Sequence, residues 1–158
     1  MLPTGTMAPG FRLYDGPDKL LNLADYRGQK VILAFYPADW SPVCGSQMNL
    51  YNEMEDYFKQ FNAQLIGISV DSRWCHAAYS EHNGFYFPIL ADFEPKGAVS
   101  KSYEAYDETT GESRRALYVI DENGVIIWSY LSPIDVNPGA DGIIRVLEES
   151  ASFKTIEL

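Results

Sequence analysis

Two short apolar runs on either side of an amphipathic stretch constrain the fold of this chain more than any other feature. Residues 30–36 (KVILAFY) and 64–70 (QLIGISV) are mostly apolar and partly β-branched, which is typical of strands buried on both faces. Between them, apolar residues recur at steps of three and four from about Pro42 to Phe61, which predicts one long helix. A strand, a helix and a strand at this spacing predict a βαβ unit with parallel strands and a right-handed crossover.

The remaining predicted elements extend this unit into a mixed sheet, parallel and then antiparallel. A second helix is expected from Asp71 or Ser72, either of which suits its N-cap, to about Asn83, with Gly84 as its stop. The other expected elements are an N-terminal hairpin from 11–13 and 20–23, a short strand at 87–90, a weaker helix at 94–103 with Pro95 near its first position, a hairpin of strands 116–120 and 125–130, and a last helix at 141–150.

The chain's length and cysteine count limit how it can be stabilised. Its 158 residues are typical of one domain, and we expect residues 1–158 to form a single α/β domain with a central mixed sheet flanked by helices. A core of this size needs no disulfide framework, and the chain has only two cysteines. Any role of Cys44 and Cys75 is therefore expected to be chemical and not a structural disulfide.

Charge and hydropathy limit the partners. The formal net charge of -10 argues against nucleic acid or an anionic membrane surface, because both require a basic footprint. No apolar run approaches the roughly 18 residues of a membrane span. The N-terminal residues lack the cationic start and apolar core of a secretory signal. We therefore expect a cytoplasmic protein whose cysteines begin as thiols.

The stretch 36–47 leaves the first buried strand and enters the long helix, at the sheet edge where open α/β proteins build their sites. Ser41 suits the N-cap and Pro42 the first helical position, which places Cys44 in the first turn. The free N–H groups and the positive end of the helix dipole favour a thiolate there, and the thiolate is the nucleophilic form of cysteine. Position alone also fits a packed structural cysteine.

Pro37, Ser41 and Cys44 stand in the spacing P-x-x-x-[ST]-x-x-C, and further stretches accompany them along nearly the whole chain. These stretches are 8–13 (APGFRL), 23–28 (LADYRG), 31–37 (VILAFYP), 68–71 (ISVD) and 115–121 (RALYVID). Together they resemble the peroxiredoxins of the alkyl hydroperoxide reductase C and thiol-specific antioxidant superfamily. The resemblance implies a thioredoxin-like fold and a thiol-dependent peroxidase that reduces hydrogen peroxide and small organic hydroperoxides.

The resemblance also implies a role for each matching residue. Cys44 is the expected peroxidatic cysteine, which attacks the O–O bond and becomes a sulfenic acid. Ser41 would hydrogen-bond the thiolate or the peroxide, and Pro37 would shield the site from water. Arg115 would stabilise the thiolate and the charge on the leaving oxygen, with Gln47 holding the arginine.

Without the resemblance, Arg115 fits a solvated strand-end residue equally well. Its neighbour Arg114 must point to the opposite face of the strand, so at most one of the two lies in a site. The residues alone do not decide whether Arg115 is a site residue or a solvated one.

Cys75 has two interpretations. It follows the second parallel strand, at the same sheet edge as Cys44, and its Trp-Cys-His context suggests exposure. Both observations favour a resolving cysteine, as in the Q-type (bacterioferritin comigratory) members. In the alternative, Cys75 is a packed helix residue and an external thiol reduces a one-cysteine enzyme. Asn49 stands where the commonest Q-type pattern has its second cysteine, and no cysteine follows Cys75. A disulfide would require Cα atoms within about 7 Å, and Gly45 would ease the local unwinding that brings them together.

Other chemistries have little support. A zinc site from Cys44, Cys75, His76 and His82 lacks a C-x-x-C pair, and no nucleotide-binding glycine pattern occurs, so we expect no cofactor and no metal. A thioredoxin-fold binding or chaperone module without turnover remains the non-enzyme alternative. From the resemblance we expect a homodimer and a thioredoxin-like or other dithiol reductant.

Overall fold

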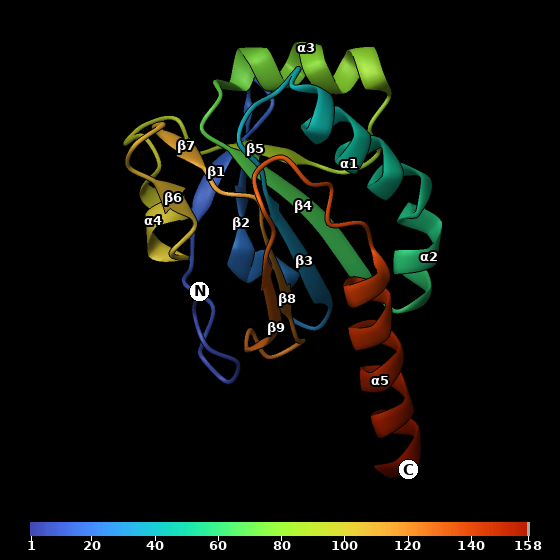
Figure 1. The fold of residues 1–158 in the computed structure, drawn as a ribbon. Helices are drawn as coiled ribbons and strands as arrows, with labels where there is room; N and C mark the ends of the chain where they lie inside the picture. Colours follow the sequence, from blue (N-terminus) through green and yellow to red (C-terminus); the bar gives the residue numbers. More distant parts are fainter. Residues whose placement is uncertain (158) are drawn as a thin grey trace.

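A seven-stranded mixed sheet forms the centre of the computed structural model, which describes residues 1–157 and the side chains of residues 1–151 (Figure 1). Strands β3, β4 and β5 are parallel, β8 and β9 continue the sheet antiparallel beside β3, and the β1–β2 hairpin pairs antiparallel with β5. In sheet order the strands are β2 (Lys19–Asn22), β1 (Arg12–Asp15), β5 (Ile89–Ala91), β4 (Ala63–Ser69), β3 (Lys30–Phe35), β8 (Ala116–Ile120) and β9 (Ile126–Leu131).

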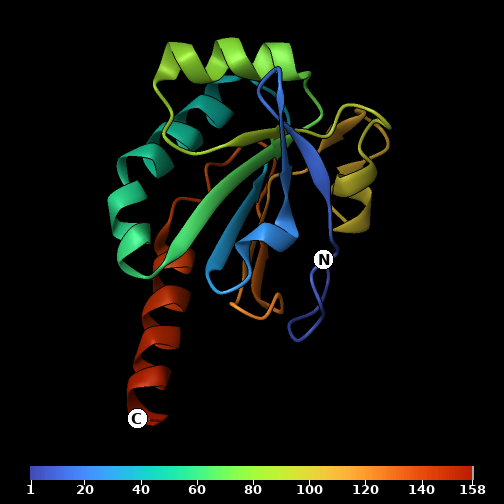
Figure 2. The ribbon, with the colours of Figure 1, turned by 180° about the vertical axis from the view of Figure 1, so that it is seen from behind.

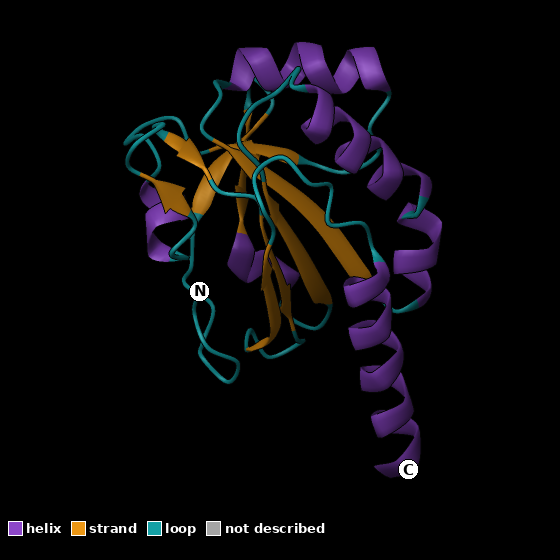
Figure 3. Cartoon of the chain, viewed as in Figure 1, coloured by secondary structure: helices purple, strands orange, loops and turns teal. Residues whose placement is uncertain are grey.

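Helices and loops cover both faces of this sheet, as Figure 2 and Figure 3 show from opposite sides. On one face, the sheet side chains Ile32, Ala34 and Tyr36 pack against the first, second, third and fifth helices. On the other face, Leu33 and Phe35 pack against the N-terminal segment and the region of the short fourth helix. The helices are α1 (Pro42–Glu53), α2 (Glu55–Gln60), α3 (Arg73–Asn83), α4 (Ala98–Ser102) and α5 (Asp141–Glu157), with a 3-10 turn η1 (Leu23–Tyr26).

The βαβ prediction is confirmed in its topology and corrected in its helix. Strands β3 and β4 are parallel neighbours, and both are almost completely buried. The helix expected from Pro42 to Phe61 is two helices, because the backbone of Met54 leaves the helical region at φ -94° and ψ 2°. The apolar periodicity runs on across this break, with Phe58 still buried, so the pattern gives no sign of it.

The helix predicted at 94–103 begins later in the structure. The prediction put Pro95 near the first position of a helix at 94–103, whereas α4 begins at Ala98. Its free N–H groups are satisfied by Asp92, whose carboxylate accepts from Val99 at 3.1 Å and Ser100 at 2.8 Å. This cap comes from the residue after β5 rather than from a residue next to the helix, so a local capping signal is missing.

The structure also has one ribbon that was not predicted and a longer last helix. A two-stranded ribbon of β6 (Tyr106–Asp107) and β7 (Glu112–Ser113), absent from the prediction, follows α4. The last helix continues beyond residue 150 to Glu157 and projects past the sheet (Figure 1). None of the helices in residues 1–157 combines the length and the apolar character needed to cross a membrane.

Candidate active site

The first turn of α1 carries Cys44, as the sequence predicts. Ser41 is the N-cap, and its side-chain oxygen accepts the Cys44 N–H at 3.3 Å, while Pro42 is the first helical residue. Pro37 is buried in the loop between β3 and α1. The Cys44 side chain is completely buried, so this loop and the helix start enclose the thiol.

The register between β3 and β8 brings Arg115 to the same place. Phe35, the last residue of β3, pairs with Ala116, the first of β8, so the preceding Arg115 lies beside the end of β3 where the loop to α1 begins. Its guanidinium Nη1 lies 3.3 Å from Cys44 Sγ and donates to Gln47 Oε1 at 2.9 Å. Arg115 is 2 % exposed, whereas Arg114 is exposed, so Arg115 is the inward member of the pair.

Further contacts hold this arginine from its far side. Arg115 Nε and Nη2 both donate to the backbone carbonyl of Ile134, at 3.0 and 2.7 Å. Gln47 Nε2 donates to the hydroxyl of Tyr51, which in turn donates to the carbonyl of Gly139. Burial raises the pKa of Tyr51 to about 12, so it stays a neutral donor. The loop after β9 thus fixes both Arg115 and Gln47.

A buried cluster of hydrogen-bonded side chains supports the active-site loop. Asp39 accepts from the hydroxyl of Tyr36 at 2.7 Å and lies 2.6 Å from His76 Nδ1, while the other ring nitrogen of His76 lies 3.0 Å from the Leu90 carbonyl. The backbone N–H of Asp39 donates to Asp71 at 2.9 Å. This cluster ties the loop before Cys44 to the start of α3.

Sequence reasoning did not find this cluster. The Trp-Cys-His context of Cys75 suggested exposure, and Trp74 is 62 % exposed and Cys75 half-buried, but His76 is only 1 % exposed. The available signal was that Asp39 and Asp71 each follow a buried strand, at sheet edges that parallel strands bring together. For Ile134 there was no signal, because it acts through a backbone carbonyl that every residue type carries.

Cys75 occupies the first turn of α3. Ser72 is the N-cap, and its side-chain oxygen accepts the Cys75 N–H at 3.1 Å. The thiol is half-buried, and one carboxylate oxygen each of Asp39 and Asp71 lies within 4.8 Å of it. Burial, then Asp39 and Asp71, raise the pKa of Cys75 to about 11. Both cysteines are free thiols, and they start neighbouring helices at the same sheet edge.

The same three side chains are the described residues that come nearest to a metal-ligand set. The oxygens of Asp39 and Asp71 and the sulfur of Cys75 lie within 4.8 Å of one another. The carboxylates already accept from Tyr36, His76 and Ser69, with the Ser69 hydroxyl 2.5 Å from Asp71. The protein's own donors therefore satisfy this cluster. His82, the remaining zinc candidate, packs on Trp40 instead.

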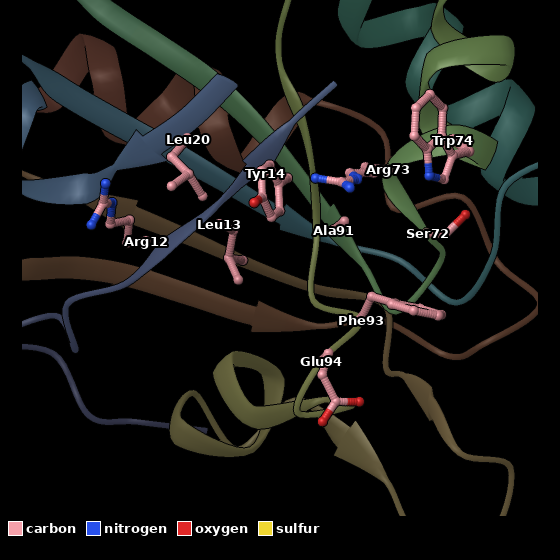
Figure 4. Close-up of a pocket in the computed structure, with 10 residues that line it drawn as sticks. All are labelled: Arg12, Leu13, Tyr14, Leu20, Ser72, Arg73, Trp74, Ala91, Phe93 and Glu94. Carbon is pink, nitrogen blue, oxygen red and sulfur yellow. The ribbon is translucent and has the colours of Figure 1, made fainter. Parts of the chain in front are cut away.

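A surface pocket of about 360 Å³ lies beside the start of α3 (Figure 4), and neither Cys44 nor Arg115 is among the residues that line it. The guanidinium of Arg73 lies 4.3 Å from the ring centre of Tyr14, on the N-terminal hairpin, and 5.4 Å from that of Trp74. Trp74 and Phe93 are more than half exposed. The pocket is lined by Arg12, Leu13, Tyr14, Leu20, Ser72, Arg73, Trp74, Ala91, Phe93 and Glu94.

The sequence of this chain is similar to those of known proteins. The AhpC/TSA family profile matches residues 4–129. The chain is 35% identical over 154 residues to a thioredoxin peroxidase of Echinococcus granulosus, covering 91% of this chain and 79% of that one. It is 35% identical over 127 residues to an alkyl hydroperoxide reductase E of Mycobacterium tuberculosis, covering 80% and 83%.

Solved structures show the same fold. A reduced 2-Cys peroxiredoxin of Plasmodium vivax superimposes with a TM-score of 0.86 and 27% identity, covering 96% of this chain and 83% of that one. AhpC of Enterococcus faecalis superimposes with a TM-score of 0.88 and 26% identity, covering 98% and 96%. The fold is thioredoxin-like, as predicted, and the sequence relatives define an enzyme class, the thiol peroxidases. The chain belongs to the AhpC/TSA family, the peroxiredoxins, and its activity is the reduction of peroxides.

Proposed function

We propose that Cys44 is the peroxidatic nucleophile of this enzyme, and the observation that carries the proposal is the Arg115 guanidinium 3.3 Å from Cys44 Sγ. The thiolate attacks one peroxide oxygen, an S–O bond forms, and the O–O bond breaks. The alkoxide or hydroxide takes up the proton that the thiol released when it became a thiolate, and Cys44 becomes a sulfenic acid. Arg115 stabilises both the thiolate and the charge that develops on the leaving oxygen.

Three neighbouring residues support this reaction. Gln47 orients Arg115 through its 2.9 Å hydrogen bond. Ser41 accepts the Cys44 N–H with its oxygen, which leaves its hydroxyl proton for the peroxide. Pro37 is buried and shields the site from water. Because Cys44 is itself completely buried, hydrogen peroxide and small organic hydroperoxides are the substrates that fit.

For the second half of the cycle, the proposal is that Cys75 attacks the Cys44 sulfenic acid, forms a disulfide and releases water. The shared sheet edge of the two helix starts supports this route. Local unwinding of the first turns would bring the two sulfurs together, and Gly45 would ease it in α1. A thioredoxin-like dithiol protein would then reduce the disulfide.

One observation favours the one-cysteine alternative. The pKa of Cys75 is raised to about 11 by burial, Asp39 and Asp71, which keeps this thiol protonated and weakly nucleophilic in the folded form. An external thiol would then reduce Cys44 directly. A binding or chaperone module without turnover would show no peroxide consumption at all.

We also propose a homodimer and a reducing compartment, the cytoplasm. Strand β9 lies at the edge of the sheet order, next to β8 only. Four apolar side chains on and after it are more than 39% exposed, which suits pairing of two copies along this edge: Tyr130 43%, Leu131 40%, Ile134 54% and Val136 47%. The two free thiols fit the compartment.

The deciding experiment is treatment with one equivalent of hydrogen peroxide, followed by intact mass and peptide mapping without reductant. A peptide that links Cys44 to Cys75 supports the two-cysteine route. A stable Cys44 sulfenic or sulfinic acid with free Cys75 supports the one-cysteine route. Wild-type protein that consumes no peroxide in the presence of a dithiol, like its Cys44→Ser variant, rules out the enzyme mechanism.

A further inference from the structure

Among the side chains that the structure describes, the hydroxyl of Tyr79 in α3 is a buried polar atom with no hydrogen-bond partner. The Tyr79 side chain is only 2 % exposed. Burying an unpaired hydroxyl lowers the stability of a fold, so such a group calls for a physical reason. By contrast, the buried hydroxyl of Tyr103 donates to the Pro9 carbonyl at 2.7 Å.

The Tyr79 hydroxyl lies against the turn that carries Cys44. A Cβ atom built on Gly45, the residue after Cys44, would lie 3.7 Å from the hydroxyl oxygen. Tyr79 and Cys44 belong to the same buried cluster. The ring of Tyr79 is fixed edge-on against Trp40 and Phe85, with centroid distances of 5.0 and 5.4 Å. The hydroxyl is therefore held at this turn by packing, without a polar partner.

The hydroxyl is a permanent donor. Burial raises the pKa of Tyr79 well above its usual value, and the negative charges of Asp39, Cys44 and Asp71 raise it further. Two carbonyl oxygens of the Cys44 turn already accept hydrogen bonds from other donors. Ser41 O accepts the Gly45 N–H, and Gly45 O accepts from Asn49. In the reduced protein the Tyr79 hydroxyl therefore donates to no acceptor among the described residues.

We propose that the Tyr79 hydroxyl donates a hydrogen bond to the oxygen that peroxide leaves on Cys44. The inference rests on the proposed function, because it requires Cys44 to be the oxidised residue. When the Cys44 thiolate takes an oxygen from the peroxide and the alkoxide departs with a proton, a new acceptor appears at the turn that Tyr79 faces. The Tyr79 proton stays on its own oxygen. Tyr79 therefore stabilises the oxidised enzyme and not the reduced one.

The test compares Tyr79→Phe with Tyr103→Phe, both in a Cys75→Ser background that prevents an intramolecular disulfide. Excess peroxide converts Cys44 to the sulfinic acid, a stable form that keeps oxygen on sulfur, and mass spectrometry verifies the conversion. The melting temperature is then measured for the reduced and the oxidised form of each protein. The quantity compared is the change in melting temperature on oxidation. This change should be more negative in Tyr79→Phe than in the parent, because only the oxidised form loses a hydrogen bond. Tyr103→Phe removes a paired hydroxyl and should lower both forms equally.

A Tyr79→Phe variant whose oxidation-dependent change in melting temperature equals that of the parent overturns the inference. A parent protein whose Cys44 is not oxidised by peroxide refutes the proposed function instead, so the two failures are distinct. A second measurement keeps the hydroxyl in place. With 3-fluorotyrosine at position 79, the 19F resonance should shift when Cys44 is oxidised, and an unchanged resonance contradicts the hydrogen bond.

Discussion

The first turns of α1 and α3 have the same local design, but the charges around them are of opposite sign. In each, a serine N-cap accepts the N–H of a cysteine three residues later, at 3.3 Å for Ser41 and Cys44 and at 3.1 Å for Ser72 and Cys75. Both turns follow parallel strands at one sheet edge. The Cys44 sulfur faces the cation of Arg115, whereas two carboxylates surround the Cys75 sulfur.

This difference shows that a helix start alone does not determine what a cysteine does. The backbone amides and the helix dipole are alike in the two turns, so they cannot separate the two thiols. The separation comes from charges delivered by distant segments. Arg115 is 71 residues from Cys44 in the chain and arrives through the register of β8 on β3.

The largest expected effect comes from removing each sulfur in turn. Cys44→Ser should lower the rate of peroxide reduction on the order of 10³-fold or more, because the hydroxyl that replaces the thiol is a far weaker nucleophile. Cys75→Ser should leave the reaction of the first equivalent of peroxide unchanged. Stopped-flow measurement of peroxide consumption, with excess enzyme and no added thiol, separates the two. A fast first reaction in Cys44→Ser would reverse the assignment of the two turns.

Next in size is the loss of the cation at the Cys44 turn. Arg115→Gln should slow the reaction of Cys44 with peroxide by about 10²- to 10³-fold, the usual cost of removing one preorganised donor from a transition state. Arg114→Gln is the matched control, since this exposed neighbour lies outside the site, and it should change the rate little. Both variants are checked for native circular dichroism, because Arg115 is buried on Gln47 and Ile134. Equal rates for the two variants would exclude Arg115 from the chemistry.

The local design of the two turns was largely predictable from sequence, because local rules govern it. The N-cap of Ser41, the first-turn position of Cys44 and the parallel strands follow from capping preferences and apolar periodicity, and the structure confirms each. The stop at Gly84 follows from its left-handed backbone, with φ 65° and ψ 41°. The catalytic roles of the site residues, and a single domain over 1–158, stay predictions.

What the sequence did not reveal depends on contacts between distant segments. The Met54 break leaves the apolar pattern intact, and the cap of α4 comes from Asp92. The Trp-Cys-His context of Cys75 suggests exposure, which holds for Trp74, but His76 is buried against Asp39 of the active-site loop. Such pairings become visible only when the order of the strands is known.

The charges around Cys75 predict an unusual pH dependence. Burial, Asp39 and Asp71 disfavour the thiolate and raise the pKa of Cys75 to about 11. In Cys44→Ser protein, the rate of Cys75 alkylation by iodoacetamide should therefore rise with pH toward a midpoint near 11. Because two pKa units are a factor of about 100 in thiolate fraction, Cys75 should react at pH 8 about 100-fold more slowly than a thiol of the ordinary pKa of 9.0.

Asp71→Asn tests the cause of this shift. Removing one negative charge near the sulfur should lower the pKa of Cys75 and speed its alkylation at neutral pH, since the Asp71 carboxylate disfavours the thiolate. Asp56→Asn, on α2 and exposed, is the control for general charge effects. A midpoint at or below 9 in the parent protein would mean that the two turns do not differ in charge environment.

The smallest effects separate the shared design of the two turns from their different chemistry. Ser41→Ala and Ser72→Ala each remove one N-cap, and each should lower the free energy of unfolding by about 1 kcal/mol in urea titrations. If only the Cys44 turn reacts with peroxide, Ser41→Ala should also slow peroxide reduction. The expected factor is about tenfold, which corresponds to one lost hydrogen bond. Ser72→Ala should leave that rate unchanged. Equal slowing by both would show that the capping of α3 also governs the reaction, because Asp39 and Asp71 connect its first turn to the active-site loop.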